Sequence, residues 1–327
     1  MRRALPLVVT ALCYLAVPPL LTGSDFVLSQ VIASLTIAGI ALPWALLGNL
    51  GGMVSFGHAA FFGVGAYVSA LLAKSWGVNP FLGLVAGGAG AAIASLVTMP
   101  ALRLRGPYFA LAILAYAHIF RILANEMTSV TGGAAGILSI PALPSFLGFT
   151  GKIGAYLTIM TILMLAVLIY KLIRDSYWGL ALKAMHDTED ATRVIGVPST
   201  LLKAAMLAVS AFITGVVGAY NAHVIGFLEP NYAFSGLWTV LPIVAAMVGG
   251  YRTLAGPIVG AALIYLLDQL VFKNILPQGH QIMFGIMVGV MILFLPAGLL
   301  PLLVRPFRSV HGLAGTPQQR KSNAASA

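Results

Sequence analysis

Residues 48–72 read GNLGGMVSFGHAAFFGVGAYVSALL, a glycine-rich stretch that runs into an apolar helix holding serine and histidine. In a water-soluble protein the glycine-rich part would form a surface loop. Here it lies between hydrophobic segments, so we expect irregular backbone at membrane depth. Lipid cannot satisfy the N–H and C=O groups of such backbone, which must be buried in protein or line a wet cavity. The stretch therefore indicates a path through a bilayer.

The composition excludes a water-soluble fold. Of the 327 residues, 60% are hydrophobic and only 8% are charged, whereas soluble domains contain about 25% charged residues. A membrane-spanning helix needs about 20 apolar residues. The sequence therefore predicts an all-α, polytopic transmembrane helix bundle of about ten spans, with broken helices and no soluble domain. The predicted spans are 4–22, 26–47, 54–73, 80–100, 107–124, 153–172, 201–225, 235–249, 254–272 and 282–303.

The basic residues predict the orientation of these spans. The net charge is +10, but no basic face with interleaved aromatic residues indicates nucleic-acid binding. If the N-terminus is cytoplasmic, 14 Lys and Arg residues fall on the inside and 4 on the outside, as the positive-inside rule requires. We therefore expect both termini in the cytoplasm, a transmembrane domain over residues 1–304 with a cytoplasmic loop at about 174–200, and a disordered cytoplasmic tail over 305–327.

The N-terminal segment has two interpretations. Arg2 and Arg3 precede an apolar stretch over residues 4–21, as in a secretory signal peptide. The stretch ends in two prolines and two leucines without a clear small-x-small cleavage site. We interpret it as an uncleaved first span.

Several kinds of chemistry lack their sequence signatures. The phosphate-binding motif GxxxxGK[ST] is missing, and the single cysteine, Cys13, allows neither an internal disulfide nor a cysteine metal site. His58, His118 and His223 show no ligand spacing, so we interpret them as hydrogen-bonded packing residues, with His58 of most interest because it lies in the broken segment. Asp268, an acid well inside a span, either pairs with Lys273 or faces a water-filled interior. We expect no catalytic residue, metal or cofactor in this chain.

The cytoplasmic loop contains an acidic cluster, HDTED, at residues 186–190. A magnesium-dependent membrane transferase would need a second acidic cluster to hold a diphosphate, and the sequence has none. The alternative is a short amphipathic helix that ends at the Gly-Val-Pro of residues 196–198, with one face formed by Leu182, Met185, Glu189 and Thr192. We favour this helix, which would insert into a socket on a partner protein.

A second glycine-rich break begins at Gly249 and resembles the first. Two hydrophobic segments interrupted by Gly or Pro in corresponding halves indicate a transport site between repeats, and the repeats are either parallel or inverted. The candidate path residues are Ser55, Gly57, His58, Gly249, Gly250, Gly256 and Pro257. The external loop 125–151 either folds over the entrance, meets an external partner, or packs as a re-entrant loop.

Together these stretches resemble the M-type permease subunits of ABC importers for branched-chain amino acids, over about residues 30–300. The most specific runs are VSFGHAAFFGVGAY at residues 54–67 and RLRGPYFAL at 103–111. The resemblance continues in TGG at 131–133 with GI at 136–137, WGLALKA at 178–184, EDAT at 189–192 before Gly196, and the segment from Gly249-Gly250 to Gly256-Pro257. Asp190 replaces the first alanine of the Glu-Ala-Ala pattern of ABC importers.

The resemblance implies a bacterial inner-membrane protein in complex with several partners. These are a homologous H-type permease, two cytoplasmic ATPases that bind ATP and Mg²⁺, and a periplasmic substrate-binding protein. The candidate ATPase-coupling residues are Lys183, Ala184, Asp187, Glu189, Asp190, Ala191 and Gly196. Relatives with this pattern also move urea, short amides or aromatic acids, so the solute is not fixed.

We therefore expect a transport subunit of an ATP-driven importer of branched-chain or other hydrophobic amino acids. The alternatives are a stand-alone channel or facilitator for a small polar solute such as urea or an amide, and a membrane-embedded transferase that uses the acidic cluster.

Overall fold

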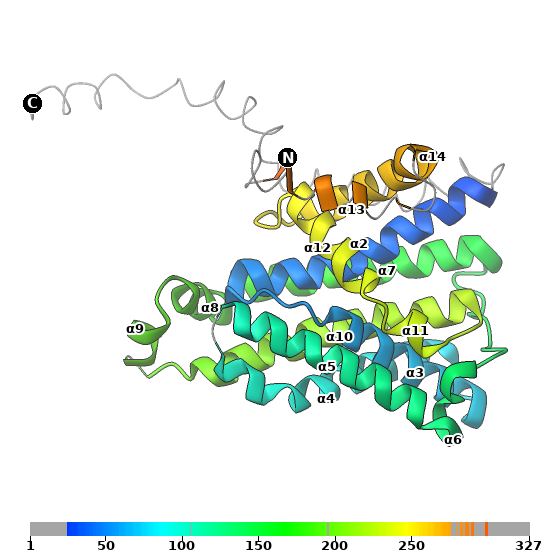
Figure 1. The fold of residues 1–327 in the computed structure, drawn as a ribbon, viewed down its shortest axis with the longest axis horizontal. Coiled ribbons are helices and arrows are strands. Elements are labelled where there is room, and N and C mark those ends of the chain that lie inside the picture. Colours follow the sequence, from blue (N-terminus) through cyan, green and yellow to red (C-terminus); the bar gives the residue numbers. More distant parts are fainter. Residues whose placement is uncertain are drawn as a thin grey trace, which may run out of the picture.

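The computed structural model describes residues 25–104, 106–194 and 196–275, followed by short stretches within 279–299. In these residues the chain is a bundle of long helices (Figure 1). Seven of the described helical segments are long and apolar enough to cross a membrane. The predicted all-α polytopic architecture is therefore confirmed. The predicted first span 4–22, most of the span 282–303 and the tail 305–327 lie outside the described residues.

The described helices coincide with the other eight predicted spans. The spanning segments are α2 (Asp25–Gly51), α3 (His58–Trp76), α4 (Pro80–Val97), α5 (Pro107–Glu126), α7 (Gly151–Asp175), α10 (Ser199–Ile225) and the pair α11 (Pro230–Ala233) and α12 (Leu237–Gly249). The eighth of these predicted spans begins as α13 (Gly256–Leu267) and continues through the π-helical turn η3 (Asp268–Phe272) into α14 (Lys273–Ile275). Its length, about 30 Å at 1.5 Å per residue, matches the hydrocarbon core of a bilayer.

Short helices occupy the two ends of the bundle. One end holds α8 (Tyr177–Asp187), α9 (Glu189–Val194) and η1 (Met99–Arg103), whereas α6 (Thr128–Thr131) and η2 (Gly133–Ala135) lie at the other (Figure 1). Helix α10 packs against α3 and α4, and α2 packs against α7, α10, α12 and α13. These contacts place α2 and α10 at the centre of the bundle.

Small residues permit the closest helix contacts. A Cβ atom at Gly65 in α3 would overlap the backbone of Gly215 in α10, and one at Gly87 in α4 would lie 2.6 Å from the carbonyl oxygen of Gly65. A Cβ at Gly260 in α13 would overlap the carbonyl of Ala245 in α12. Such close backbone approach drives helix association in lipid. The glycines at four-residue spacing in α4 and α13 are thus packing residues.

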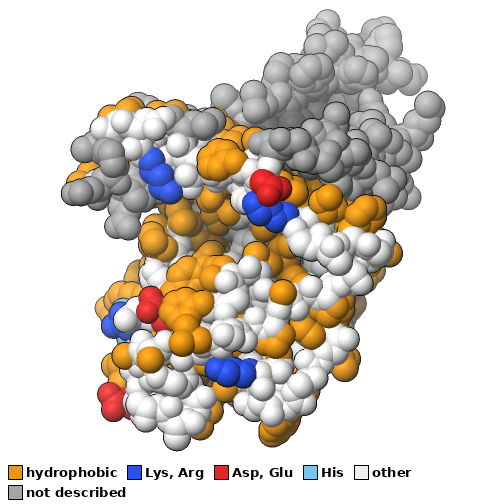
Figure 2. All heavy atoms as spheres, turned by 90° about the vertical axis from the view of Figure 1, so that its right-hand side faces the viewer, with side chains coloured by type: hydrophobic (Ala, Val, Ile, Leu, Met, Phe, Trp, Pro, Cys, Tyr) orange, Lys and Arg blue, Asp and Glu red, His pale blue; other side chains and the backbone are white. Residues whose placement is uncertain are grey.

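The loop between α5 and α7 lies across the helix ends at the α6 end of the bundle. Ile137 and Leu228 exchange backbone hydrogen bonds, and the amide of Ile140 donates to the carbonyl of Gly226 over 3.0 Å. Lys74 Nζ donates to the carbonyl of Leu138 over 3.0 Å. These bonds hold the loop against the segment that follows α10 and against the end of α3. Figure 2, which faces this end, shows a few charged side chains among hydrophobic ones.

Candidate functional site

The break between α2 and α3 runs from one end of the bundle to its middle. Gly52, with φ of 62°, turns the chain out of α2, and α3 begins only at His58. His58 Nε2 lies 3.0 Å from the Ser210 hydroxyl, and Ser210 is central in α10. The break therefore covers residues 52–57. The predicted break from residue 48 and helix start at 54 were wrong, since α2 continues through Gly51.

Side chains of distant segments satisfy the backbone of this break. The Trp44 indole Nε1 donates to the carbonyl of Ser55 over 2.8 Å. The Thr239 hydroxyl donates to the carbonyl of Phe56 and accepts from the amide of Ala59, each over 3.2 Å. The carbonyls of Ser55 and Phe56 and the amide of Ala59 therefore have protein partners, as an irregular segment at membrane depth requires.

The Thr239 contact also brings two helix N-termini together in the middle of the bundle. Thr239 lies in the first turn of α12, and Ala59 lies in the first turn of α3. Each helix N-terminus has partial positive charge because its first N–H groups lack helical partners. Sequence reasoning missed Thr239, although a lone hydroxyl inside an apolar span was a usable signal.

His58 links three helices. The Ser210 hydroxyl donates to the carbonyl of Pro43 in α2 over 3.0 Å, so it accepts a hydrogen from His58 Nε2. This chain of bonds assigns the Nε2–H tautomer. His223 is likewise bonded, to Ser69 and to the carbonyl of Pro141. Both residues fit the predicted packing role.

Two other ionisable residues inside spans have different surroundings. His118 is exposed on α5, so it does not pack inside this chain as predicted. Asp268 is buried at the π-helical turn, with its Oδ2 atom 3.8 Å from Lys273 Nζ. The predicted pairing of Asp268 with Lys273 is present.

The second group of path candidates lies elsewhere. Gly249 ends α12 and Gly256-Pro257 begins α13, so together with Gly250 they form a turn between two helices. Asn49 Nδ2 donates to the carbonyl of Arg252 in this turn over 3.4 Å, which places the turn beside the C-terminal end of α2. The structure therefore does not bring these residues to mid-depth beside His58. Trp44 connects the two groups, since its indole bonds to Ser55 and its ring meets the Tyr251 ring edge-on at 6.3 Å.

The predicted coupling loop forms two short helices, α8 and α9, with Thr188 between them, so the prediction of a single helix that ends at residues 196–198 was wrong. In α8, Leu182 and Met185 are buried, whereas Lys183, Ala184 and Asp187 are exposed, as the amphipathic pattern predicted. The Ser176 hydroxyl caps α8 by accepting from the amide of Gly179 over 3.3 Å. A Cβ atom at Gly179 would overlap the last carbonyls of α7, so glycine permits the tight corner between α7 and α8.

The remaining coupling candidates lie in and after α9. Asp190 and Ala191 belong to α9, and Gly196 turns the chain towards α10 with φ of 87°. Glu189 faces inward: its Oε1 atom lies 2.8 Å from Lys203 Nζ in α10 and 3.0 Å from Arg193 Nη2. Glu189 thus fixes α9 to a membrane span.

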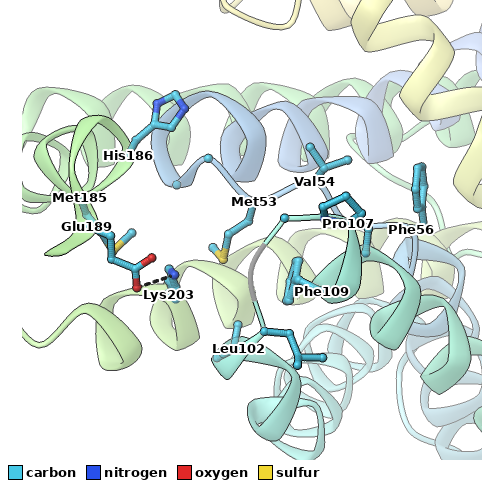
Figure 3. A pocket seen from close by; sticks show the side chains of 15 residues that line it. Met53, Val54, Phe56, Leu102, Pro107, Phe109, Met185, His186, Glu189 and Lys203 are labelled. Carbon is cyan, nitrogen blue, oxygen red and sulfur yellow. Dashed lines mark hydrogen bonds and ion pairs between the residues drawn. The ribbon is translucent and has the colours of Figure 1, made fainter.

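A cavity of about 470 Å³ lies between the coupling loop and the break. Figure 3 shows Glu189 and Lys203 at one side of it, with Met53 and Phe109 on the other. The His186 ring occupies the space that a Cβ atom at Gly52 would need. The coupling loop therefore contacts the first residue of the break directly. The lining residues are Gly51, Gly52, Met53, Val54, Phe56, Leu102, Leu104, Gly106, Pro107, Phe109, Ala110, Met185, His186, Glu189 and Lys203.

Residues 26–296 match a protein family described as branched-chain amino acid transport system / permease component. This match covers most of the chain. The chain belongs to this family.

Two curated relatives of this permease are similar over most of its length. Both are named high-affinity branched-chain amino acid transport system permease protein LivM. The Salmonella typhimurium (strain LT2) protein is 28% identical over 311 residues, covering 84% of this chain and 71% of the relative. The Escherichia coli (strain K12) protein is 29% identical over 316 residues, covering 86% and 72%. No solved structure matches.

Family membership and the helices together define the class of protein. The chain is a multi-pass membrane protein and a permease subunit of an ABC importer. The predicted family, fold class and general function are confirmed.

Proposed function

We propose that this permease moves branched-chain or other hydrophobic amino acids into the cell as one half of a permease pair. The observation that supports a path at mid-depth is the meeting of the α3 and α12 N-termini beside the extended break. Broken helices whose N-termini meet near the bilayer midplane are a recurrent way to bind the carboxylate of a transported amino acid. Each helix terminus contributes about 0.3–1 kcal/mol, so binding here is weak and selectivity rests with an external binding protein.

The break then acts as the moving part of the path. Ser55, Gly57 and His58 line the route where the extended segment meets α5, α10 and α12. A Cβ atom at Gly57 would lie 2.7 Å from the carbonyl of Ile113 in α5. The α12–α13 turn, with Gly249, Gly250, Gly256 and Pro257, moves against the end of α2 as the path opens.

Two cytoplasmic ATPase subunits drive the cycle through α8 and α9. The outer face of α8 exposes large apolar side chains, with Tyr177 79%, Trp178 62% and Leu180 66% exposed, beside Lys183 and Asp187. Exposed apolar groups rimmed by charges are typical of a protein–protein contact. The contact between His186 and Gly52 gives the motion of α8 a direct route to the break.

The remaining parts of the proposal follow from the charge distribution and the resemblance. The protein lies in a bacterial inner membrane, with α8 and α9 on the cytoplasmic side and both termini in the cytoplasm. A periplasmic binding protein delivers solute to the end covered by the α5–α7 loop. An H-type permease completes the pair. The partner ATPases bind ATP and Mg²⁺, and this chain uses no cofactor.

Reconstitution tests the proposal. Vesicles that contain this permease, the second permease and two ATPases should accumulate leucine, isoleucine or valine only with ATP and the binding protein. The same vesicles with the permease alone should show no flux. Uptake of leucine by the permease alone, or ATP-driven uptake of urea with none of amino acids, would refute it.

A further inference from the structure

The cavity beside α9 has the size of a small-molecule site and two kinds of surface. Its volume of about 470 Å³ lies within the range of about 300–1,000 Å³ typical of ligand pockets. Most of its wall is apolar, from side chains such as Met53, Phe56, Leu102 and Phe109. Among the described residues that line it, the acidic and basic side chains are Glu189 and Lys203, which form an ion pair.

This charged pair is well shielded from solvent. The side chains of Lys203 and Glu189 are 11% and 19% exposed, and their charged atoms are 2.8 Å apart. The Glu189 carboxylate accepts from Lys203 and from Arg193. A carboxylate and an ammonium thus lie together at one side of an apolar chamber.

We propose that this cavity is a second, cytoplasmic-side binding site for an amino acid with an apolar side chain. The α-ammonium of the ligand binds the Glu189 carboxylate, the α-carboxylate binds Lys203, and the side chain lies against Met53 and Phe109. A zwitterion suits the pair because each of its charges meets an opposite one. A simple anion would meet Glu189 beside Lys203, and a simple cation would meet Lys203 and Arg193.

The site has a consequence for transport, and here the inference rests on the proposed function. An amino acid in the cavity would lie between the break and the coupling loop, in contact with Met53 and beside the contact of His186 with Gly52. It would resist the motion of α8 against the break. Accumulated amino acid inside the cell would therefore slow further uptake.

Binding to the purified permease complex in nanodiscs tests the site without ATP or the binding protein. Three probes separate the anchors: leucine, leucinamide without the carboxylate, and 4-methylpentanoate without the ammonium. We expect leucine to bind at least about tenfold more tightly than either analogue, because each lost charge removes a charge-assisted hydrogen bond. Equal binding of 4-methylpentanoate, or no binding of leucine at millimolar concentration, would overturn the proposal.

Variants locate the binding to this cavity. Lys203→Met should weaken leucine binding at least about tenfold and remove the preference over leucinamide. Ala110→Leu narrows the cavity, keeps both charges and should also weaken binding. It provides an independent test if Lys203→Met does not fold. The control Lys171→Gln removes an exposed charge at the same end of the bundle and should bind leucine normally. Unchanged binding by both cavity variants would refute the site.

A lipid headgroup is the competing occupant. If leucine does not bind and co-purified phosphatidylglycerol falls in Lys203→Met, the cavity is a lipid site and the inference is wrong. The proposed function is tested separately, by ATP-driven leucine uptake from outside the vesicle. Normal uptake without leucine binding in the cavity would refute only the second site. Absence of uptake by the unmodified complex would refute the proposed function.

Discussion

The Trp44 indole donates a 2.8 Å hydrogen bond to the carbonyl of Ser55, eleven residues away across the turn out of α2. Trp44 is buried, and its ring also meets Tyr251 of the α12–α13 turn. One side chain of α2 therefore contacts both glycine-rich breaks. This contact stabilises the extended conformation of residues 52–57 at a depth where no lipid group can replace the donor.

Replacing Trp44 by phenylalanine should remove this donor while keeping most of the ring volume. An unsatisfied buried carbonyl costs about 1–3 kcal/mol, so the melting temperature of the complex in detergent should fall and uptake should slow. Trp76→Phe is the matched control, because Trp76 is 78% exposed. An equal loss of stability in both variants would contradict the role of Trp44.

The bond between His58 and Ser210 gives a second prediction. Glutamine can place an amide nitrogen near the position of His58 Nε2, whereas leucine offers no donor. His58→Gln should therefore keep most of the stability and transport. His58→Leu should lose about 1–3 kcal/mol of unfolding free energy, because the Ser210 hydroxyl loses its donor. Thermal unfolding and vesicle uptake measure the difference. Equal behaviour of the two variants would show that the hydrogen bond is not needed.

Gly57 gives a test of the break itself. A Cβ atom there would overlap the Ile113 side chain and lie 2.7 Å from its carbonyl oxygen, so Gly57→Ala must displace the break from α5. Overpacking of this kind costs about 1–3 kcal/mol, and we expect uptake to fall strongly. Gly236→Ala is the control, since a Cβ at Gly236 has no neighbouring atom within 4 Å. Normal flux in Gly57→Ala would exclude this segment from the path.

The sequence predicted the spans well because lipid imposes a simple rule on length and apolarity. The end of α7 at Asp175 and the start of α13 at Gly256 fall within a few residues of prediction. The contacts that hold the first break at this depth were not predictable. Its hydrogen-bond partners include Thr239, 183 residues from Phe56, and no local pattern reveals which distant hydroxyl reaches a backbone group.

The coupling loop shows the same limit. Periodicity correctly predicted that Leu182 and Met185 lie on one buried face of a helix, but it placed Glu189 in the same helix, whereas Glu189 begins α9. It could not show that Lys203, in another helix, lies opposite Glu189. A charge reversal at Glu189 would set three cations together and destabilise the loop, since breaking a buried pair costs about 3–5 kcal/mol. A variant at Glu189 would therefore not separate loss of ATPase docking from loss of loop structure. Substitutions that test docking belong on the outer face of α8.

Leu180→Asp on that outer face should weaken the attachment of the ATPase subunits without unfolding the permease. Leu180 is 66% exposed, so the substitution leaves no cavity, but it places a charge in an apolar contact. We expect loss of co-purified ATPase and of uptake, with an unchanged melting temperature of the permease. Leu201 is 62% exposed on α10, and the control Leu201→Asp should retain both the co-purified ATPase and uptake. ATPase retention by Leu180→Asp would refute docking on α8.

The exposed face of α5 should contact the second permease. This helix is the least buried of the seven candidate spans in the described residues, since only 28% of its 18-residue apolar stretch is buried. It exposes His118 among apolar side chains. A polar group that faces lipid is costly, so we expect the face with His118 to be covered by protein. The exposed face of α4 is apolar and can face lipid. His118→Cys, in a Cys13→Ala background, should therefore crosslink to a cysteine placed in the partner permease. Ile93→Cys on α4, a residue 66% exposed, should not. Crosslinking through Ile93 in place of His118 would assign the interface to α4.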